Sequence, residues 1–160
     1  MKLSHYQAAG FYPIDLVAPN AMFEMPVAAA ITIEKGDYLI SDGSGYVTQT
    51  ATDTSALFLG IAAEDCDNSA GAAGAKSVNI IRCTNASIRF SVPVGNLVVI
   101  TRAMVGLTCD LNTNALLDIA DTTIGTNTVG FHIEDFDASV EAIDGATLGY
   151  AIGTFILRAP

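Results

Sequence analysis

Short segments rich in β-branched residues, separated by turn signals, run through most of this chain of 160 residues. Residues 30–34 alternate apolar and polar side chains, as a half-buried strand does, and Asp42-Gly43-Ser44-Gly45 has the composition of a tight hairpin turn. No window keeps a helical apolar period beyond about eight residues. Many short strands with frequent turns predict an all-β fold, an antiparallel β-sandwich or β-barrel.

The same pattern gives expected positions for the individual elements. Acidic residues at 64–68 and 135–139 and small residues at 69–75 predict loops, and residues 103–107 are expected to begin a strand. The other strands are expected at residues 30–34, 38–40, 46–50, 57–63, 78–82, 87–92, 97–100, 108–111, 116–117, 128–134 and 147–157.

Residues 1–26 differ from the remainder and are predicted to form an extended N-terminal arm, followed by a β domain at 27–160. Pro13, Pro19 and Pro26 exclude a continuous helix. Large apolar side chains in such an arm need a surface, either on their own domain or on a neighbouring subunit or another protein. The candidate contact residues are Tyr6, Phe11, Tyr12, Met22, Phe23 and Met25.

An internal similarity appears at an offset of 70 residues. The segment from Gly60 to Ser69 matches the segment from Gly130 to Ser139, with Gly, Glu, Asp, Asp and Ser recurring in place, and the same offset maps Gly36 onto Gly106. This similarity predicts two related β units within one domain. The alternative is that these matches between the two segments arise by chance.

Composition excludes several classes of protein. A hydrophobic content of 51% with 15% charged residues is not that of a disordered chain. A net charge of −10 disfavours nucleic-acid binding and docking on anionic membranes. The longest uncharged apolar stretch is about 12 residues, too short to span a bilayer. The three cysteines have neither zinc-site nor disulfide spacing, so buried reduced thiols are expected.

Two acidic segments are the candidate cation sites. Their carboxylates are oxygen ligands of the kind that Ca²⁺ takes, but neither segment has the following glycine and distal glutamate of a calcium loop. The preferred interpretation is that these side chains are solvated strand ends, so no metal and no cofactor are expected. The residues concerned are Glu64, Asp65 and Asp67, and Glu134, Asp135 and Asp137.

Catalysis is not expected. His132 lies in a predicted strand, with Glu134 on the same face, and the sequence contains no Gly-x-Ser-x-Gly nucleophile turn. His132 is therefore expected to be a surface or interface residue. A carboxylate pair for glycoside cleavage stays open, although no tryptophan is present to stack on a sugar.

With these elements placed, the chain resembles the head-decoration, or capsid cement, proteins of tailed bacteriophages. The resemblance covers roughly residues 27–100: an Ala-rich strand with a Gly36-Asp37 turn at 28–40, the hairpin at 42–47, and Leu59-Gly60-Ile61-Ala62. The second half departs from the pattern, because Gly106 is followed by Leu107 and Gly130 by Phe131 and His132.

The resemblance implies a β-sandwich or barrel that coats an assembled capsid, bridges subunits of the major capsid protein and has no catalytic activity. It further implies a homo-oligomer, commonly a trimer, located on the virion surface and made in the host cytoplasm, with no nucleic-acid or membrane partner. The six apolar arm residues would then contact the capsid or a neighbouring subunit. Alternatives are another virion β module, from a tail tube or fibre base, a cell-surface adhesin domain, and an acidic domain that binds Ca²⁺ or carbohydrate.

Overall fold

The computed structural model describes residues 12–15, 17, 21–49, 58–83, 88–94, 99–111, 117–120, 122, 129–137 and 149–157. Its strands form three antiparallel sheets, and the one helix with described bounds is the short 3-10 helix η3 (Arg102–Met104). The predicted all-β antiparallel fold is therefore confirmed. The arrangement is sandwich-like, and no sheet closes into a barrel in the described part of the chain.

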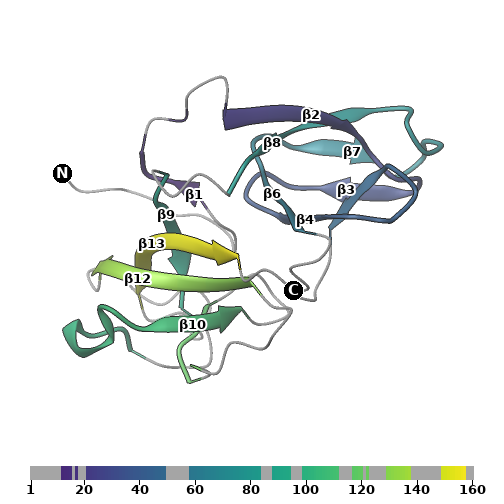
Figure 1. The fold of residues 1–160 in the computed structure, drawn as a ribbon. Coiled ribbons are helices and arrows are strands. Elements are labelled where there is room, and N and C mark those ends of the chain that lie inside the picture. The colour runs from purple at the N-terminus through teal and green to yellow at the C-terminus, as the bar shows by residue number, and fades with distance from the viewer. Residues whose placement is uncertain are drawn as a thin grey trace.

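The first sheet has five strands in the order β2-β8-β6-β4-β5, and a two-stranded sheet pairs β3 with β7. These seven strands, the first unit, occupy one side of the molecule in Figure 1. Their bounds are β2 (Met22–Pro26), β3 (Ile31–Ile33), β4 (Tyr38–Ser41), β5 (Val47–Gln49), β6 (Phe58–Ala62), β7 (Cys66–Asn68) and β8 (Ser77–Ile81).

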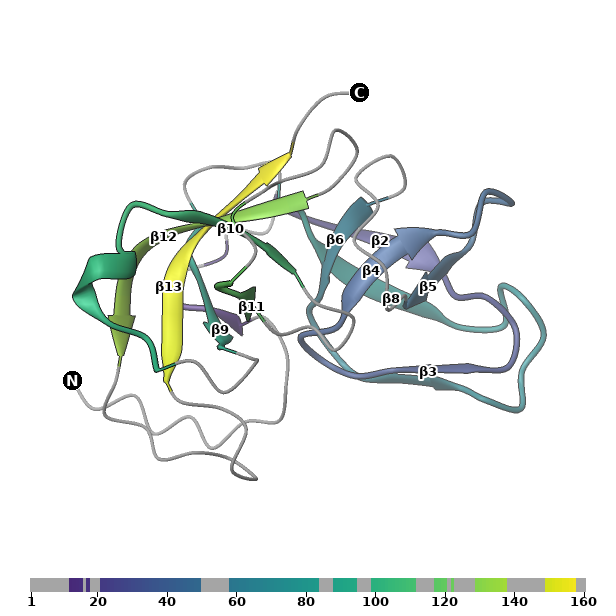
Figure 2. The ribbon, with the colours of Figure 1, turned by 90° about the horizontal axis from the view of Figure 1, so that it is seen from below.

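The second sheet has six strands in the order β1-β9-β13-β12-β10-β11. All but β1 come from the second half of the chain and form the second unit, which lies beside the first in both ribbon views (Figures 1 and 2). The bounds are β1 (Tyr12–Pro13), β9 (Phe90–Pro93), β10 (Thr108–Leu111), β11 (Leu117–Asp118), β12 (Val129–Asp137) and β13 (Tyr150–Leu157).

The two units repeat one strand order. Without β1, the second sheet reads β9-β13-β12-β10-β11, which matches β2-β8-β6-β4-β5 strand for strand. The register of the pairs agrees as well: Leu39 lies opposite Gly60 in the first unit, and Cys109 lies opposite Phe131 in the second. An isolated parallel bridge also recurs, as Val27–Val47 and Val94–Leu117. The chain thus contains two related β units.

The pairing corrects the ungapped sequence alignment by one residue. The bridge residues Val47 and Leu117 are equivalent, and their pairing with β4 and β10 makes Leu39 equivalent to Cys109. The equivalent of Gly60 is therefore Phe131 rather than Gly130. Likewise, Pro26 corresponds to Pro93 and Ser77 to Tyr150. The difference in residue number between equivalent positions of the two units therefore grows from 67 to 70 to 73 along the chain. Small insertions between strands accumulate, and a fixed offset cannot follow them.

Equivalent positions form the core of each unit. Ten apolar side chains at five equivalent positions are at most 1% exposed. The five side chains of the first unit share one apolar cluster with Ile33 of β3 and Cys66 of β7. The equivalent pairs are Val27 and Val94, Leu39 and Cys109, Val47 and Leu117, Ala62 and Ile133, and Val78 and Ala151.

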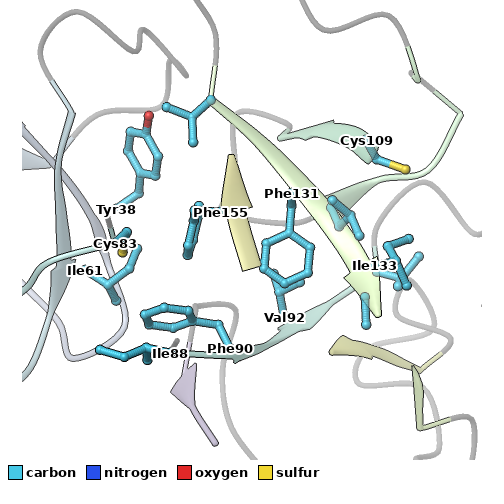
Figure 3. Packing of buried hydrophobic residues seen from close by; sticks show 14 of the residues in the cluster. Tyr38, Ile61, Cys83, Ile88, Phe90, Val92, Cys109, Phe131, Ile133 and Phe155 are labelled. Atoms are coloured by element: carbon cyan, nitrogen blue, oxygen red, sulfur yellow. The ribbon is translucent and has the colours of Figure 1, made fainter. Parts of the chain in front are cut away.

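A shared aromatic core joins the two units. Phe155 of β13 lies at its centre, with ring centroids 5.1 Å from Phe90, 5.4 Å from Phe131 and 5.7 Å from Phe58 of the first unit. Tyr38 stacks on Phe58 at 4.4 Å. Figure 3 shows Tyr38, Phe90, Phe131 and Phe155 of this core converging between the strands of the two units. Because one apolar cluster contains residues of both sheets, the units form a single packed body.

The outward faces of the two sheets differ in polarity. In the first sheet, Tyr38, Ile61 and Ile81 face the second unit and are buried in the shared core. The equivalent side chains of the second sheet are polar and half-buried: Thr108, His132 and Thr154. The contact between the units is therefore made by different surfaces of the two repeats, which leaves the outer face of the second sheet uncovered by a repeat.

Several expected boundaries change. Residues 22–26, assigned to the arm, form β2, an edge strand paired with β8 along its whole length. Residues 66–68, expected to be a loop, form β7, because Cys66 and Asn68 face inward while Asp67 is exposed. Residues 102–104 form η3 rather than a strand, and β12 continues to Asp137 through a β-bulge near Ile133.

Candidate interaction surfaces

The described part of the N-terminal segment is bound to its own chain. β1 pairs with β9, and the Ile14 N–H donates to the carbonyl oxygen of Arg89 at 2.9 Å. Asp15 accepts hydrogen bonds from the Arg89 backbone N–H, Nε and Nη2 at 2.7, 3.1 and 2.8 Å. These donors, the side chain of Arg89 first, lower the pKa of Asp15. The segment is thus anchored to the edge of the second sheet.

Tyr12 reaches from that edge to the first unit. Its ring lies against Gly36, where an added Cβ would come within 2.9 Å of Cζ, and its hydroxyl donates to the Lys35 carbonyl oxygen at 3.2 Å. Burial first, and then the charges of Asp37 and Glu34, raise the pKa of Tyr12. β1 therefore ties the two units together, with its backbone on one and its ring on the other.

The other predicted contact residues fall into two groups. Met22, Phe23 and Met25 lie on β2 and are half-buried, Met22 against the shared core and the other two against the core of the first unit. The guanidinium of Arg82 lies over the Phe23 ring, 4.2 Å from its centroid. Tyr6 and Phe11 lie outside the described residues, so their predicted contacts stay predictions.

The Gly36 turn has a counterpart at Gly106. Gly36 and Gly106 have φ values of +93° and +92°, a conformation that glycine adopts readily. The Gly36 N–H donates to Ala62 and the Gly106 N–H to Ile133, at 2.9 and 2.8 Å. A second bond closes each turn, from Asp37 to Glu34 and from Leu107 to Met104. The two turns share one backbone structure.

The surroundings of the Gly36 and Gly106 turns are different. Gly36 is buried beneath Tyr12, whereas an added Cβ at Gly106 would meet no described atom within 4 Å. The residues flanking Gly106 are apolar and exposed, Val105 at 37% and Leu107 at 36%. The sequence pattern predicts the start of a strand at these residues. The signal that could have found them was the Gly36–Gly106 match together with the change from Lys35 and Asp37 to Val and Leu.

The first acidic segment makes structural hydrogen bonds. Glu64 Oε1 accepts from the N–H and Nδ2 of Asn79 at 3.0 and 2.8 Å. Asp65 Oδ1 accepts from the Lys35 N–H at 2.7 Å, and Asp67 Oδ1 accepts from the Ser69 N–H at 2.9 Å. The hydrogen bonds of Ser69 lower the pKa of Asp67. These carboxylates serve three separate loop contacts rather than converging on one point.

The second acidic segment is also dispersed. Glu134 Oε1 accepts from Thr154 Oγ1 at 3.1 Å, and Asp135 Oδ1 accepts from the Phe136 N–H at 2.9 Å. Asp137 is the last residue of β12. Among the residues that the structure describes, no group of three or more His, Cys, Asp or Glu side chains is placed to hold a metal ion.

His132 lies on the outer face of the second sheet. Its Nδ1 is 3.1 Å from Oγ1 of Thr108, its neighbour across the β10–β12 pair, and the two side chains share a hydrogen bond. This places His132 at a half-buried surface position, as a strand residue with a threonine partner.

No helix in the described ranges is both long and apolar enough to cross a membrane. No family model matches the sequence, and no curated protein or solved structure matches it either.

Proposed function

We propose that this protein is a structural component of a tailed-phage virion that decorates and cements the capsid by bridging subunits of the major capsid protein. The observation that supports it most is the pair of related β units held in one body by the shared aromatic core. A clamp between equivalent capsid subunits needs related surfaces at a fixed separation. Two units with one strand order and a shared core supply related backbone frameworks at a fixed separation.

The energetics of a lattice favour such a design. A capsid presents the same surface many times, so modest contacts made by two units of one rigid body combine through effective concentration. Clamping then opposes the separation of neighbouring capsid subunits under the pressure of packaged DNA. The net charge of −10 disfavours binding to that DNA and keeps the protein soluble before it attaches.

The N-terminal segment is the proposed link to neighbouring chains. Its described part spans both units through β1 and Tyr12, and Tyr6 and Phe11 precede that anchor. In this proposal the segment contacts the capsid or an adjacent copy, and the protein works as a homo-oligomer, with a trimer favoured by the resemblance to decoration proteins.

Co-sedimentation with capsids tests the proposal. Capsids assembled without this protein are mixed with the wild-type chain, with the combined variant Tyr6→Ser and Phe11→Ser, and with Val99→Ser as a control. Val99 is a 54% exposed apolar residue outside the segment. We expect the wild type and V99S to sediment with capsids and the combined variant to stay in the supernatant. Failure of the wild type to sediment would contradict the function, and equal sedimentation of the combined variant would contradict the role of the segment.

A further inference from the structure

The Gly106 turn has the structure of a ring-binding turn without a ring. In the first unit, the turn of the same backbone geometry is covered by Tyr12, whose ring and hydroxyl both contact it. In the second unit, no described atom lies where the ring would be. Tyr12 is already placed on Gly36, so the same residue of the same chain cannot fill both turns.

The two turns differ in the side chains that flank them. The first turn is flanked by Lys35 and Asp37, although a ring covers it. The uncovered turn is flanked by Val105 and Leu107, which are 37% and 36% exposed. Besides Val99, these are the large exposed apolar residues of the described chain. Contiguous exposed apolar side chains mark interaction sites more often than isolated ones do.

The outer face of the second sheet, which no repeat covers, is polar. The outer face of the second sheet carries Thr108, His132 and Thr154 where the covered face of the first sheet carries Tyr38, Ile61 and Ile81. The face on which no repeat packs is thus polar, whereas the Gly106 turn is flanked by apolar residues. This contrast favours an occupied turn.

We propose that the Val105–Gly106–Leu107 turn binds the aromatic ring of Tyr6 from the N-terminal segment of a second copy of this chain. The same segment supplies the ring for the first turn. Residues 1–11 contain Lys2 and no Asp or Glu, whereas the whole chain has a net charge of −10, so the segment is attracted to the acidic body of another copy. The contact joins two different surfaces, and it can therefore repeat from copy to copy and close a ring.

The proposed contact forms between copies in solution and does not depend on the capsid role. Tyr6 lies six residues before Tyr12, so an extended chain places its Cα atom at most about 20 Å from the anchored strand. That reach allows a neighbouring copy in direct contact and excludes a distant one.

Isotope-resolved photo-cross-linking tests the occupant. The full chain, with benzoylphenylalanine at position 6, is mixed in unlabelled and ¹⁵N-labelled form, irradiated and analysed by mass spectrometry. We expect cross-links from position 6 to residues 105–107 in mixed-isotope pairs. Cross-links to these residues within one chain only, or cross-links elsewhere, would overturn the proposal. The result is independent of capsid binding, which co-sedimentation measures separately.

A variant pair tests the turn. Val105→Lys with Leu107→Asp installs the flanks of the first turn on the second, and Val99→Lys removes a comparable exposed apolar residue elsewhere. Sedimentation velocity over a range of concentrations should show self-association weakened at least tenfold by the double variant and unchanged by V99K. A monomeric wild type, or equal association of wild type and double variant, would overturn the proposal. Unchanged circular dichroism confirms that both variants fold.

Discussion

Two glycines of this protein lie where a neighbouring strand leaves no room for a side chain. Gly153 of β13 lies opposite Ile133 of β12, and a Cβ added to it would overlap the carbonyl oxygen of His132. Gly60 plays a similar part in the first unit, against the carbonyl oxygen of Ile81. Such sites tolerate no side chain, because backbone atoms rather than flexible side-chain ends fill the space.

We therefore predict that Gly153→Ala lowers the free energy of unfolding by more than about 2 kcal/mol, since a strand must shift to admit the methyl group. Gly43→Ala is the matched control: its φ is +81°, but an added Cβ would meet no described atom within 4 Å. Conformational strain alone should cost the control about 1 kcal/mol. Urea denaturation measures the free energy of unfolding of both variants. Equal losses of unfolding free energy in the two variants would contradict close backbone packing at Gly153.

Asp37 makes stability depend on pH. Burial, and then the charges of Glu34 and Asp65, raise the pKa of its carboxyl above the usual 3.8, against the opposing hydrogen bond from the Glu34 N–H. A carboxyl with a raised pKa in the folded state stabilises the protein below its unfolded pKa, and this contribution is lost as pH rises through the folded pKa.

Asp37→Asn keeps an oxygen acceptor for the Glu34 N–H and removes the charge. We predict that the difference in unfolding free energy, variant minus wild type, increases as pH rises from 3.8 through the raised pKa and is constant above it. Denaturant titrations of both proteins across that range provide the measurement. A difference that falls with increasing pH would show that the carboxylate is stabilised rather than destabilised by its surroundings.

At the scale of elements, β7 depends on one buried amide. Asn68 is 1% exposed, and its Nδ2 donates to the carbonyl oxygens of Ala28 and Ala72 at 2.8 and 3.1 Å. The side chain thus connects β7 to the segment before β3 and to the loop after itself. Without it, the Ala28 carbonyl oxygen loses this donor, and the Ala72 carbonyl oxygen keeps only the N–H of Ala75.

Asn68→Ala should reduce the free energy of unfolding by about 1–3 kcal/mol, the cost of leaving buried polar groups unpaired. Asn68→Asp should cost more at neutral pH, because a carboxylate offers no donor and places a charge beside two carbonyl oxygens. Thermal denaturation at pH 7 ranks the two variants. An aspartate variant as stable as the wild type would contradict the assigned hydrogen bonds.

Element prediction succeeded where side chains alternate clearly between apolar and polar. The strands expected at 30–34, 38–40 and 78–82 lie within one residue of β3, β4 and β8 at each end. β7 was missed because its inward residues, Cys66 and Asn68, do not form an apolar pattern, and its place is fixed by pairing with β3. The strand expected at 103–107 was wrong, because Gly106 closes a turn after η3.

The candidate site was partly visible in the sequence. The match of Gly36 with Gly106 could be found by offset, but the ring on Gly36 could not, since it comes from a residue 24 positions earlier in the chain. Likewise, the burial of Met22, Phe23 and Met25 in β2 depends on pairing with a strand more than 50 residues away. Contacts of this range leave no local pattern.

At the scale of the whole molecule, the shared core should make the two units unfold together. Phe155 is 7% exposed and contacts aromatic rings of both units. We predict that Phe155→Ala costs about 3–5 kcal/mol, as truncation of a buried phenylalanine does. Phe136→Ala, at a half-buried position on the rim of the same core, should cost less than half as much.

Calorimetry of the wild type should show one transition, with equal calorimetric and van't Hoff enthalpies. Two resolved transitions would mean that the units are independent domains, and a rigid clamp could not then be built from them.

Quantitative mass spectrometry of phage particles, purified from the cells that produce them, decides whether this protein is a structural part of the virion. We expect the chain in washed particles at a fixed ratio to the major capsid protein. Its absence from purified particles, with the protein recovered only in the soluble fraction of the lysate, would rule out the proposed role.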